Sequence, residues 1–359
     1  MNNTSTGINL KDFDILTKEF KAQVLITHGA GHHADDVFST ALCVFMSHLS
    51  SSSLTYVNNI NIDIAGFTMV DHRDFLSGIW DGHFKYGMHP VVIRTTDLDI
   101  INEITNKCKK DNIEYIVYDI GRGEFDHHQE DTDVRENGIK YASFGLLWRH
   151  FGNVKKFPAF DHFIEKIDDH DNGGEMCIVN RMISDFNPIW VFTNEHERTS
   201  ANHTDRCFER AVNFAYQYII NFFMQQCSQR DEYIFPLIEN EGEILNLEGY
   251  NVLFLEKRFI PWRRYAHINN YCSGNTDKKH IHAAIYPSNW GPGYYVYEIL
   301  SDGLNTMKAS RRFDVSISGK DKSLLPEGFA FVHKSGFLAN FINAEFAKKG
   351  VKYITELEK

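Results

Sequence analysis

The sequence predicts an α/β protein, in which a mainly parallel sheet with helices on both faces is followed by a smaller α+β lobe. Short apolar runs alternate with segments of helical spacing through the first half of the chain. This is the pattern of parallel strands that are joined by helical crossovers. Metal-binding residue types follow several of these runs. Open α/β sheets place their ligand sites there, at the carboxyl ends of the strands.

The first predicted element is a buried strand over Val24–Thr27, a β-branched and apolar run bounded by glycine. A largely apolar segment, residues 37–49, predicts the helix that follows. Asp35 or Asp36 is the expected N-cap of this helix, because a short acidic side chain can accept the unpaired N–H groups of the first turn.

The same pattern continues along the chain. β-branched and aromatic runs predict strands, and apolar residues at helical spacing predict helices between them. The predicted strands cover residues 54–57, 62–70, 91–95 and 115–120, and the predicted helices cover residues 100–110, 141–151 and 160–167.

The chain beyond residue 200 predicts a second lobe of different construction. A long helix over residues 202–230 precedes a series of strands and a closing helix. The expected strands are 251–255, 282–286, 294–300 and 328–333, and the closing helix is 337–348. We therefore predict a catalytic metal-binding domain over 1–200, a connecting helix within 201–235 and a substrate-binding domain over 236–359, with the substrate in the cleft between the two domains.

Composition limits the function. The 359 residues carry a formal charge of −11, from 37 basic and 48 acidic side chains. This charge argues against a surface that follows the phosphates of long duplexes, but not against a short anionic substrate. No apolar run is long enough to span a bilayer, and residues 1–14 lack the regions of a secretory signal. Six scattered cysteines predict reduced thiols, so we expect a cytoplasmic protein without a membrane partner.

Histidine and aspartate gather in three places at the ends of predicted strands and helices. Six residues form the predicted metal-ligand set: His28, His33, Asp35, Asp119, His127 and Asp168. Mixed nitrogen and oxygen ligands suit Mn²⁺, Mg²⁺ or Fe²⁺, and Zn²⁺ less clearly. Six ligands are too many for one catalytic ion, and they suit two ions that share a carboxylate. The alternative interpretations are a polar surface loop near His127 and an acidic turn near Asp168.

The pair His127 and His128 predicts a division of roles. Neighbouring side chains on an extended segment project to opposite sides. One imidazole would then bind metal, while the other faces a substrate oxygen.

An ordered series of motifs resembles the melanocyte proliferating gene family, an outlying branch of the DHH phosphoesterase superfamily. The series covers most of the chain, from about residue 24 to residue 345. Its parts are Thr27-His28 with His33 and Asp35, Arg94-Thr95 with Asp97, Asp119, Asp126-His127-His128-Gln129, Ile167-Asp168, Asp171-Asn172-Gly173, Asn187-Pro188 with Trp190, Pro261-Trp262, and Phe331 to Phe337.

The resemblance implies a metal-dependent phosphohydrolase with 3′-to-5′ exonuclease activity on RNA. It implies two ions and a water or hydroxide between them as the nucleophile. Manganese is the ion we expect, because the ligand set mixes histidine and aspartate and has no cysteine near it. The implied ligands are His28, His33 and Asp119 for one ion, and Asp35, Asp119, His127 and Asp168 for the other. Asp119 would bridge the ions and His128 would contact the scissile phosphate. We count His128, Asp126 and Asp97 as the catalytic set.

The chain also departs from the family pattern. His32 stands where a bulky apolar residue is more usual, and Ala339-Asn340 replace a common Gly-Gly. The candidates for substrate binding are Arg258 and His333, with Ser335 and Gly336 as backbone donors at an expected helix start. These changes concern the choice of substrate and leave the metal set intact.

Three functions stay open at this point. The first is a nuclease that acts on RNA or short oligonucleotides, and the second is a phosphatase or pyrophosphatase that acts on a small nucleotide. The third is a non-catalytic metal-binding scaffold protein. The net charge of −11 favours a small substrate slightly. The sequence is also compatible with a homo-oligomer.

Overall fold

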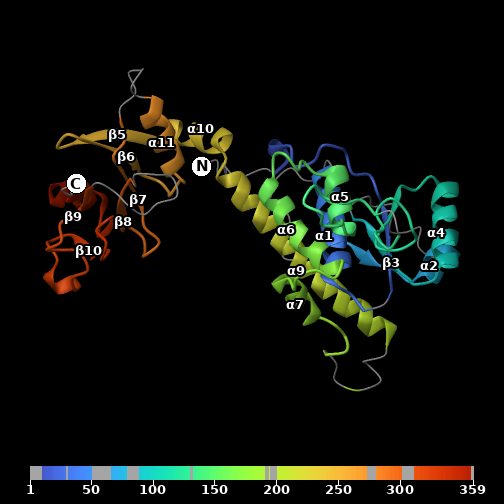
Figure 1. Ribbon diagram of the computed structural model, residues 1–359. Helices are drawn as coiled ribbons and strands as arrows, with labels where there is room; N and C mark the ends of the chain where they lie inside the picture. The colour runs from blue at the N-terminus through green and yellow to red at the C-terminus, as the bar shows by residue number, and fades with distance from the viewer. Residues whose placement is uncertain are drawn as a thin grey trace. The chain divides into compact units, whose positions relative to one another are not determined.

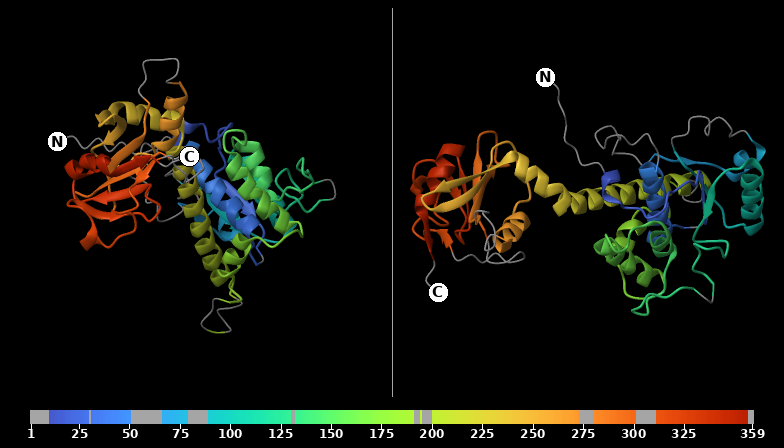
Figure 2. Two further views of the ribbon diagram at one scale, coloured as in Figure 1. Left: turned by 60° about the vertical axis from the view of Figure 1, so that its left-hand side comes forward. Right: turned by 90° about the horizontal axis from the view of Figure 1, so that it is seen from above.

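The computed structural model describes residues 10–29, 31–50, 66–78, 89–129, 132–190, 194, 200–272, 280–300 and 311–356. The chain divides into two compact units, Met1–Gln225 and Gln226–Lys359 (Figures 1 and 2). The first contains a parallel sheet with helices and the second a mixed sheet, so the predicted α/β class is confirmed. The expected strand over residues 54–57 lies outside the described residues.

The first unit is built on a parallel sheet with the strand order β2-β3-β1-β4. The strands are β1 (Val24–Thr27), β2 (Thr68–Met69), β3 (Val91–Arg94) and β4 (Tyr115–Val117). Every residue of β1 and β3 is buried, as expected of central strands that are covered on both faces. The predicted strands at 24–27, 91–95 and 115–120 are thus confirmed with small changes at their ends.

Helices lie on both faces of this sheet (Figure 1). The helices α2 (His72–Ser77) and α4 (Leu98–Asp111) bury Phe75, Ile101 and Ile104 against the β1–β3 face. On the other face lies α1 (Ala34–Ser50). Three further helices pack against α1, namely α5 (Ser143–Phe151), α6 (Pro158–Asp171) and the short α7 (Ile178–Ser184). The predicted helix 37–49 therefore begins three residues earlier, at Ala34, which places Asp35 and Asp36 inside its first turn.

Aromatic side chains join α1, α5 and α6 to the long helix α9 (Ala201–Ser228). Phe223 of α9 stacks on Phe45 of α1, with ring centroids 5.2 Å apart. The same ring lies 4.7 Å from Phe160, which in turn meets Trp148 edge to face at 4.9 Å. Such aromatic pairs add to the free energy gained by burying their area. Most of α9 therefore packs as a core helix of the first unit.

The second unit contains a six-stranded sheet with the order β10-β11-β8-β7-β6-β5. The strands are β5 (Gly242–Leu247), β6 (Tyr250–Leu255), β7 (Ala283–Pro287), β8 (Tyr295–Ile299), β10 (Phe329–Val332) and β11 (Leu338–Phe341). β6 and β7 pair in parallel, and the other neighbours pair antiparallel. A smaller sheet pairs β9 (Arg311–Phe313) with β12 (Ile354–Glu356).

Both faces of the larger sheet are covered, because alternate residues of each strand point to opposite sides. Leu253 and Ala284 face the core under α10 (Asp231–Glu241) and α11 (Arg263–Cys272). Val252, Phe254 and Ile285 face the core to which α12 (Ala344–Lys349) contributes Ala347.

This unit differs from the prediction at its closing helix and in elements that were not predicted, which are α10, α11, β5, β9 and β12. The expected closing helix over residues 337–348 is wrong in its first half, which forms β11, and α12 starts only after Asn343, whose side chain accepts from the N–H of Phe346. The sequence analysis also missed β5. Its hairpin turn uses Glu248 and Gly249, which both have positive φ, the geometry that matches the twist of paired strands.

Candidate metal centre

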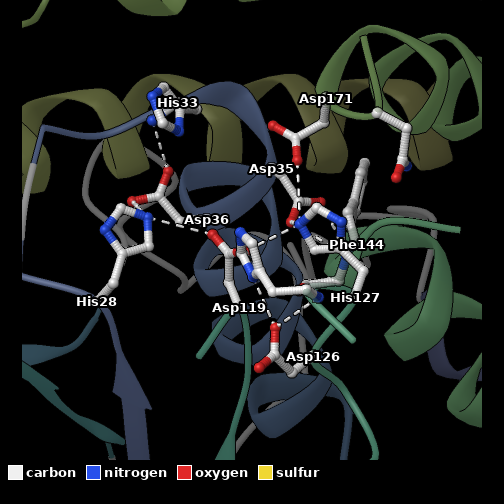
Figure 3. Close-up of polar contacts among 12 residues, drawn as sticks. His28, His33, Asp35, Asp36, Asp119, Asp126, His127, Phe144 and Asp171 are labelled. Carbon is white, nitrogen blue, oxygen red and sulfur yellow. Dashed lines mark hydrogen bonds and ion pairs between the residues drawn. The ribbon is translucent and has the colours of Figure 1, made fainter. Parts of the chain in front are cut away.

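Seven side chains gather at the carboxyl ends of β1 and β4, which are adjacent and parallel (Figure 3). His28 follows the last residue of β1, and Asp119 lies two residues beyond β4. The N-terminus of α1, the loop after Asp119 and the end of α6 supply the rest. The seven form three overlapping groups with the spacing of metal ligands: His28, Asp36 and Asp119; Asp119, His127 and His128; Asp35, His127 and Asp171.

Asp119 lies between the two halves of this cluster, one with His28 and Asp36 and the other with Asp35, His127 and Asp171. One carboxylate oxygen, Oδ2, is 3.2 Å from Nε2 of His28, and the other, Oδ1, is 3.2 Å from Nε2 of His127. The residue has a φ of +56°, a left-handed conformation that Asp adopts more readily than most residues. Its position gives each side of the cluster one oxygen of the same carboxylate, the arrangement expected of a bridging ligand.

His127 is the centre of the second half. Its Nε2 lies 3.0 Å from Oδ2 of Asp171 and 4.0 Å from Oδ2 of Asp35. The two carboxylates come from different helices, since Asp35 is in the first turn of α1 and Asp171 is the last residue of α6. The fold thus brings together residues that are far apart in sequence.

The first turn of α1 orients both of its carboxylates. Asp36 accepts a 2.7 Å hydrogen bond from the N–H of His33 through Oδ1, the backward contact of a capping box. Its other oxygen is buried, lies 3.4 Å from Nε2 of His28 and has no hydrogen-bond partner among the described residues. Asp35 accepts the N–H groups of Ser143 and Phe144, at 3.0 and 2.8 Å, at the start of α5.

Burial makes this cluster electrostatically unusual. It raises the pKa of Asp36 to about 6 and, together with the nearby charges of Asp119 and Asp171, raises the pKa of Asp35. Burial alone would lower the pKa of His127, but its hydrogen bonds with Asp119 and Asp171 raise it. Protons are therefore held where several carboxylates crowd together, because burial and mutual repulsion disfavour the charged forms, and the nearby charge of Arg94 offsets this only in part for Asp36.

This donor set fits a divalent metal. Four carboxylates and three imidazoles supply oxygen and nitrogen ligands, and one oxygen of Asp36 has unmet bonding capacity. Hard or borderline divalent ions accept such a set, and no cysteine belongs to the three groups. The buried acidic and histidine groups can thus bind a metal ion.

The predicted division between His127 and His128 rests on geometry that is wrong. The two rings lie on the same side, with centroids 4.2 Å apart, and both approach Asp119. The segment is not extended, because Asp126 accepts the N–H groups of Arg122 and His128 and turns the chain. Asp126 also contacts Nδ1 of His128 at 2.7 Å, so it orients this ring and not His127.

Asp168 and Asp171 lie one turn apart on α6 and face different surroundings. The carboxylate of Asp168 is fully buried. Its Oδ2 lies 2.7 Å from Nη2 of Arg135, and its Oδ1 accepts a hydrogen bond from the N–H of Gly145. Within the described chain it belongs to none of the three groups, whereas Asp171 does. The structure therefore places Asp171 beside His127, where the sequence analysis placed Asp168.

His33 and Asp97 also lie outside the three groups. The side chain of His33 is exposed, and its ring centroid is 6.0 Å from that of His28. Asp97 is the exposed N-cap of α4 and accepts the N–H groups of Asp99 and Ile100. The cap explains why an aspartate stands at this position, and the catalytic role stays a prediction.

The four predicted substrate-binding residues are engaged with neighbours in the second unit. Arg258 forms a double hydrogen bond with Glu241, the shorter one at 2.6 Å. His333, Ser335 and Gly336 form the turn between β10 and β11, so the expected helix start is wrong. In this turn the N–H groups of Ser335 and Gly336 donate to the ring and carbonyl of His333. The turn also needs glycine, since Gly336 has a φ of +68°.

The sequence analysis missed Asp36 and Asp171 as ligand candidates. Asp36 directly follows the predicted ligand Asp35, and Asp171 lies three residues after the predicted ligand Asp168, in the Asp-Asn-Gly motif. In α6 the helical period was the available signal, because residues three apart are neighbours on a helix surface, so Asp171 was as good a candidate as Asp168. Asp36 accepts the N–H of His33 because α1 begins at Ala34. The helix was predicted to begin at residue 37, so this contact was not predicted.

A comparison with models of protein families gives a match over most of the chain. Residues 84–350 match the family model MYG1_exonuc, described as Uncharacterised protein family (UPF0160). No curated protein matches the chain. In the described part of the chain, no helix has both the length and the apolar character needed to cross a membrane.

Proposed function

Because the chain belongs to the MYG1_exonuc family, we propose that it is a divalent-metal-dependent phosphohydrolase, a 3′-to-5′ exonuclease that acts on RNA or short oligonucleotides. The family name indicates an exonuclease-like function. The observation that carries the proposal is that residues before the matched range meet residues inside it. His28, Asp35 and Asp36 lie before residue 84, yet they meet Asp119 and His127 in one cluster.

The cluster supports hydrolysis at phosphorus. Bound divalent ions would neutralise the charge of a phosphodiester and lower the pKa of a water molecule. His28, Asp36 and Asp119 would hold one ion, and Asp35, His127 and Asp171 would hold the other, with Asp119 close to both. Manganese is the ion we propose, since the set mixes nitrogen and oxygen and contains no thiolate.

His128 has the properties of a group that meets the substrate. Its side chain is 59% exposed, in contrast to the buried ligands around it. Because Asp126 holds Nδ1, the Nε2 atom is the one available to a substrate. A positioned donor to a phosphate oxygen stabilises the charge that develops in the transition state.

A small nucleotide is the second candidate substrate. The observation that favours it is the net charge of −11, which would repel a long polyanion. A phosphatase or pyrophosphatase would use the same cluster, so only the substrate distinguishes the two proposals.

A substrate screen tests the proposed function. The purified protein is supplied with Mn²⁺ and incubated separately with short RNA, short DNA, a cyclic dinucleotide and pyrophosphate. We expect stepwise release of nucleoside monophosphates from the 3′ end of RNA and complete loss of this activity with a chelator. Cleavage of pyrophosphate alone would favour the second candidate. Absence of hydrolysis with every substrate, although the metal binds, would favour a scaffold protein.

A further inference from the structure

His32 is a buried histidine whose bonding capacity is unmet. Its side chain is 1% exposed and packs edge-on against Phe208 of α9, with ring centroids 5.9 Å apart. Neither ring nitrogen has a hydrogen-bond partner among the described residues. A neutral imidazole offers one donor and one acceptor, and buried polar groups in proteins are almost always bonded. A group outside the described side chains is therefore expected to bond to His32.

This histidine lines a cavity of about 610 Å³ within the first unit. The cavity runs from His32 and His33, before α1, to the end of α6 and along α7. Its volume is within the range of pockets that hold small molecules.

The cavity borders the metal centre. Asp171 lines it and also lies 3.0 Å from Nε2 of His127, so this carboxylate belongs to both. A ligand whose phosphate reached the metal centre could extend its remaining atoms into the cavity. The cavity is therefore a place for the part of the substrate next to the reacting phosphate.

The lining has the chemistry that recognises a nucleoside. Met176 is 75% exposed and offers an apolar, polarisable surface for a flat base. Asn180 has a buried side-chain oxygen without a hydrogen-bond partner in the described part of the chain. Arg181 is exposed, and no described side chain pairs with its guanidinium group. A cavity for a simple inorganic anion would need neither the apolar surface nor the neutral donors and acceptors.

We propose that this cavity binds the terminal nucleoside of the substrate, and that His32 and Asn180 form hydrogen bonds with its base or ribose. The ligand class is a nucleoside 5′-monophosphate unit. This inference rests on the proposed function and adds a subsite that the metal cluster does not include. His32 is a specificity-determining residue in this arrangement, because an apolar side chain at its position could not form these bonds.

Binding of adenosine 5′-monophosphate tests the inference without turnover. Its dissociation constant is measured by calorimetry on the Mn²⁺-loaded full-length protein, with inorganic phosphate as the reference probe. We expect tighter binding of the nucleotide than of phosphate. His32→Phe keeps an aromatic ring against Phe208 and removes both bonding groups, so it should weaken nucleotide binding about tenfold, the effect of one or two lost hydrogen bonds. Binding of phosphate and of Mn²⁺ should not change.

Two further variants keep the test decisive if His32→Phe fails to fold. Asn180→Ala should weaken nucleotide binding in the same way. Ser184→Ala is the matched control, since this residue lines the same cavity but its hydroxyl donates to the carbonyl of Arg181. Equal binding of nucleotide and phosphate, or unchanged nucleotide binding in both test variants, would overturn the inference.

The outcome is separable from that of the proposed function. If no oligonucleotide is hydrolysed but the nucleotide binds through His32, the subsite is supported and the proposed reaction is wrong. If RNA is hydrolysed and the variants bind the nucleotide normally, the reaction stands and the subsite is wrong.

Discussion

The candidate site residues of the two units differ in how fully their bonding is met inside the protein. In the first unit, Asp119 is shared between His28 and His127, and one oxygen of Asp36 has no hydrogen-bond partner among the described residues. In the second unit, Arg258 is matched by Glu241, and the turn around His333 satisfies its own donors. A buried polar atom without a hydrogen-bond partner indicates a ligand site. A side chain whose polar atoms all have partners inside the protein needs no ligand to explain its position.

The same contrast occurs within α6. Asp168 accepts hydrogen bonds from Arg135 and from the N–H of Gly145, so its oxygens have partners within the protein, although burial raises its pKa to about 7. Asp171 meets His127 at the edge of a cavity. We therefore expect Asp168 to serve stability and Asp171 to serve ligand binding, and substitution of each residue tests this expectation.

The largest effect is expected at the shared carboxylate. Asp119→Asn keeps the size of the side chain and tolerates the positive φ, but it removes the charge that both halves of the cluster use. We expect loss of bound Mn²⁺ and more than about 100-fold lower hydrolysis, beyond the usual effect of residues that orient a ligand. Elemental analysis and initial rates on short RNA measure both.

Asp126→Asn is the matched control for this change. Asp126 contacts His128 and two backbone N–H groups and lies outside the three ligand groups in the described chain. We expect its substitution to lower the rate about 10- to 100-fold with metal content kept. Greater activity in Asp119→Asn than in Asp126→Asn would show that the bridging role is assigned to the wrong residue.

The next effect separates stability from metal binding on α6. Asp168→Asn leaves the buried guanidinium of Arg135 with only Asp161, so we expect a loss of about 3 kcal/mol in the free energy of unfolding. Asp171→Asn should change stability less, because the lost contact with His127 is offset by relief of repulsion with Asp35. It should instead lower metal content.

Denaturant unfolding of the metal-free variants and elemental analysis of the loaded ones measure the two properties separately. If Asp168→Asn loses metal at unchanged stability while Asp171→Asn keeps it, the ligand set first predicted from the sequence is correct and the geometric assignment fails.

The fold and much of the site could be predicted from local patterns. The runs that form β1 and β3 are mostly apolar because both of their faces are buried, and their ends locate His28 and the loops of the site. Asp119 was predictable for the same reason, since it closely follows β4.

The remainder depends on contacts between distant segments. Nothing near Asp168 in the sequence shows that Arg135 pairs with it, and nothing near Asp35 shows that it caps α5 through Ser143 and Phe144. Likewise, the turn around Asp126 is formed by backbone N–H groups, which every sequence carries. Local patterns therefore locate polar clusters, but partners decide which members remain free to bind a ligand.

A smaller effect concerns the pH dependence of metal binding. In the metal-free protein the hydrogen bonds with Asp119 and Asp171 outweigh burial and raise the pKa of His127, so its imidazole keeps a proton at neutral pH. Metal binds only the deprotonated ring and must expel this proton. The affinity for Mn²⁺ should therefore increase with pH, by about tenfold per unit for each proton released.

Calorimetric titration in two buffers of different ionisation enthalpy measures the number of protons released at each pH. Asp171→Asn removes one of the two contacts that hold the proton, so its residual binding should depend less on pH. An Mn²⁺ affinity that is independent of pH, with no proton release, would contradict the electrostatic description of the cluster.

The smallest effect is expected in the second unit, at the pair formed by Arg258 and Glu241. The side chain of Arg258 is 38% exposed, and a pair with this exposure contributes less than about 1 kcal/mol. If the pair is structural, Arg258→Ala and Glu241→Ala should lower the free energy of unfolding by similar small amounts and leave KM for short RNA equal in both.

If Arg258 instead exchanges its partner for a substrate phosphate, Arg258→Ala alone should increase KM, while Glu241→Ala, which frees the guanidinium, should decrease it. Opposite changes in KM would mean that a paired residue still binds substrate, and the contrast between the two units would then hold only in the absence of the ligand.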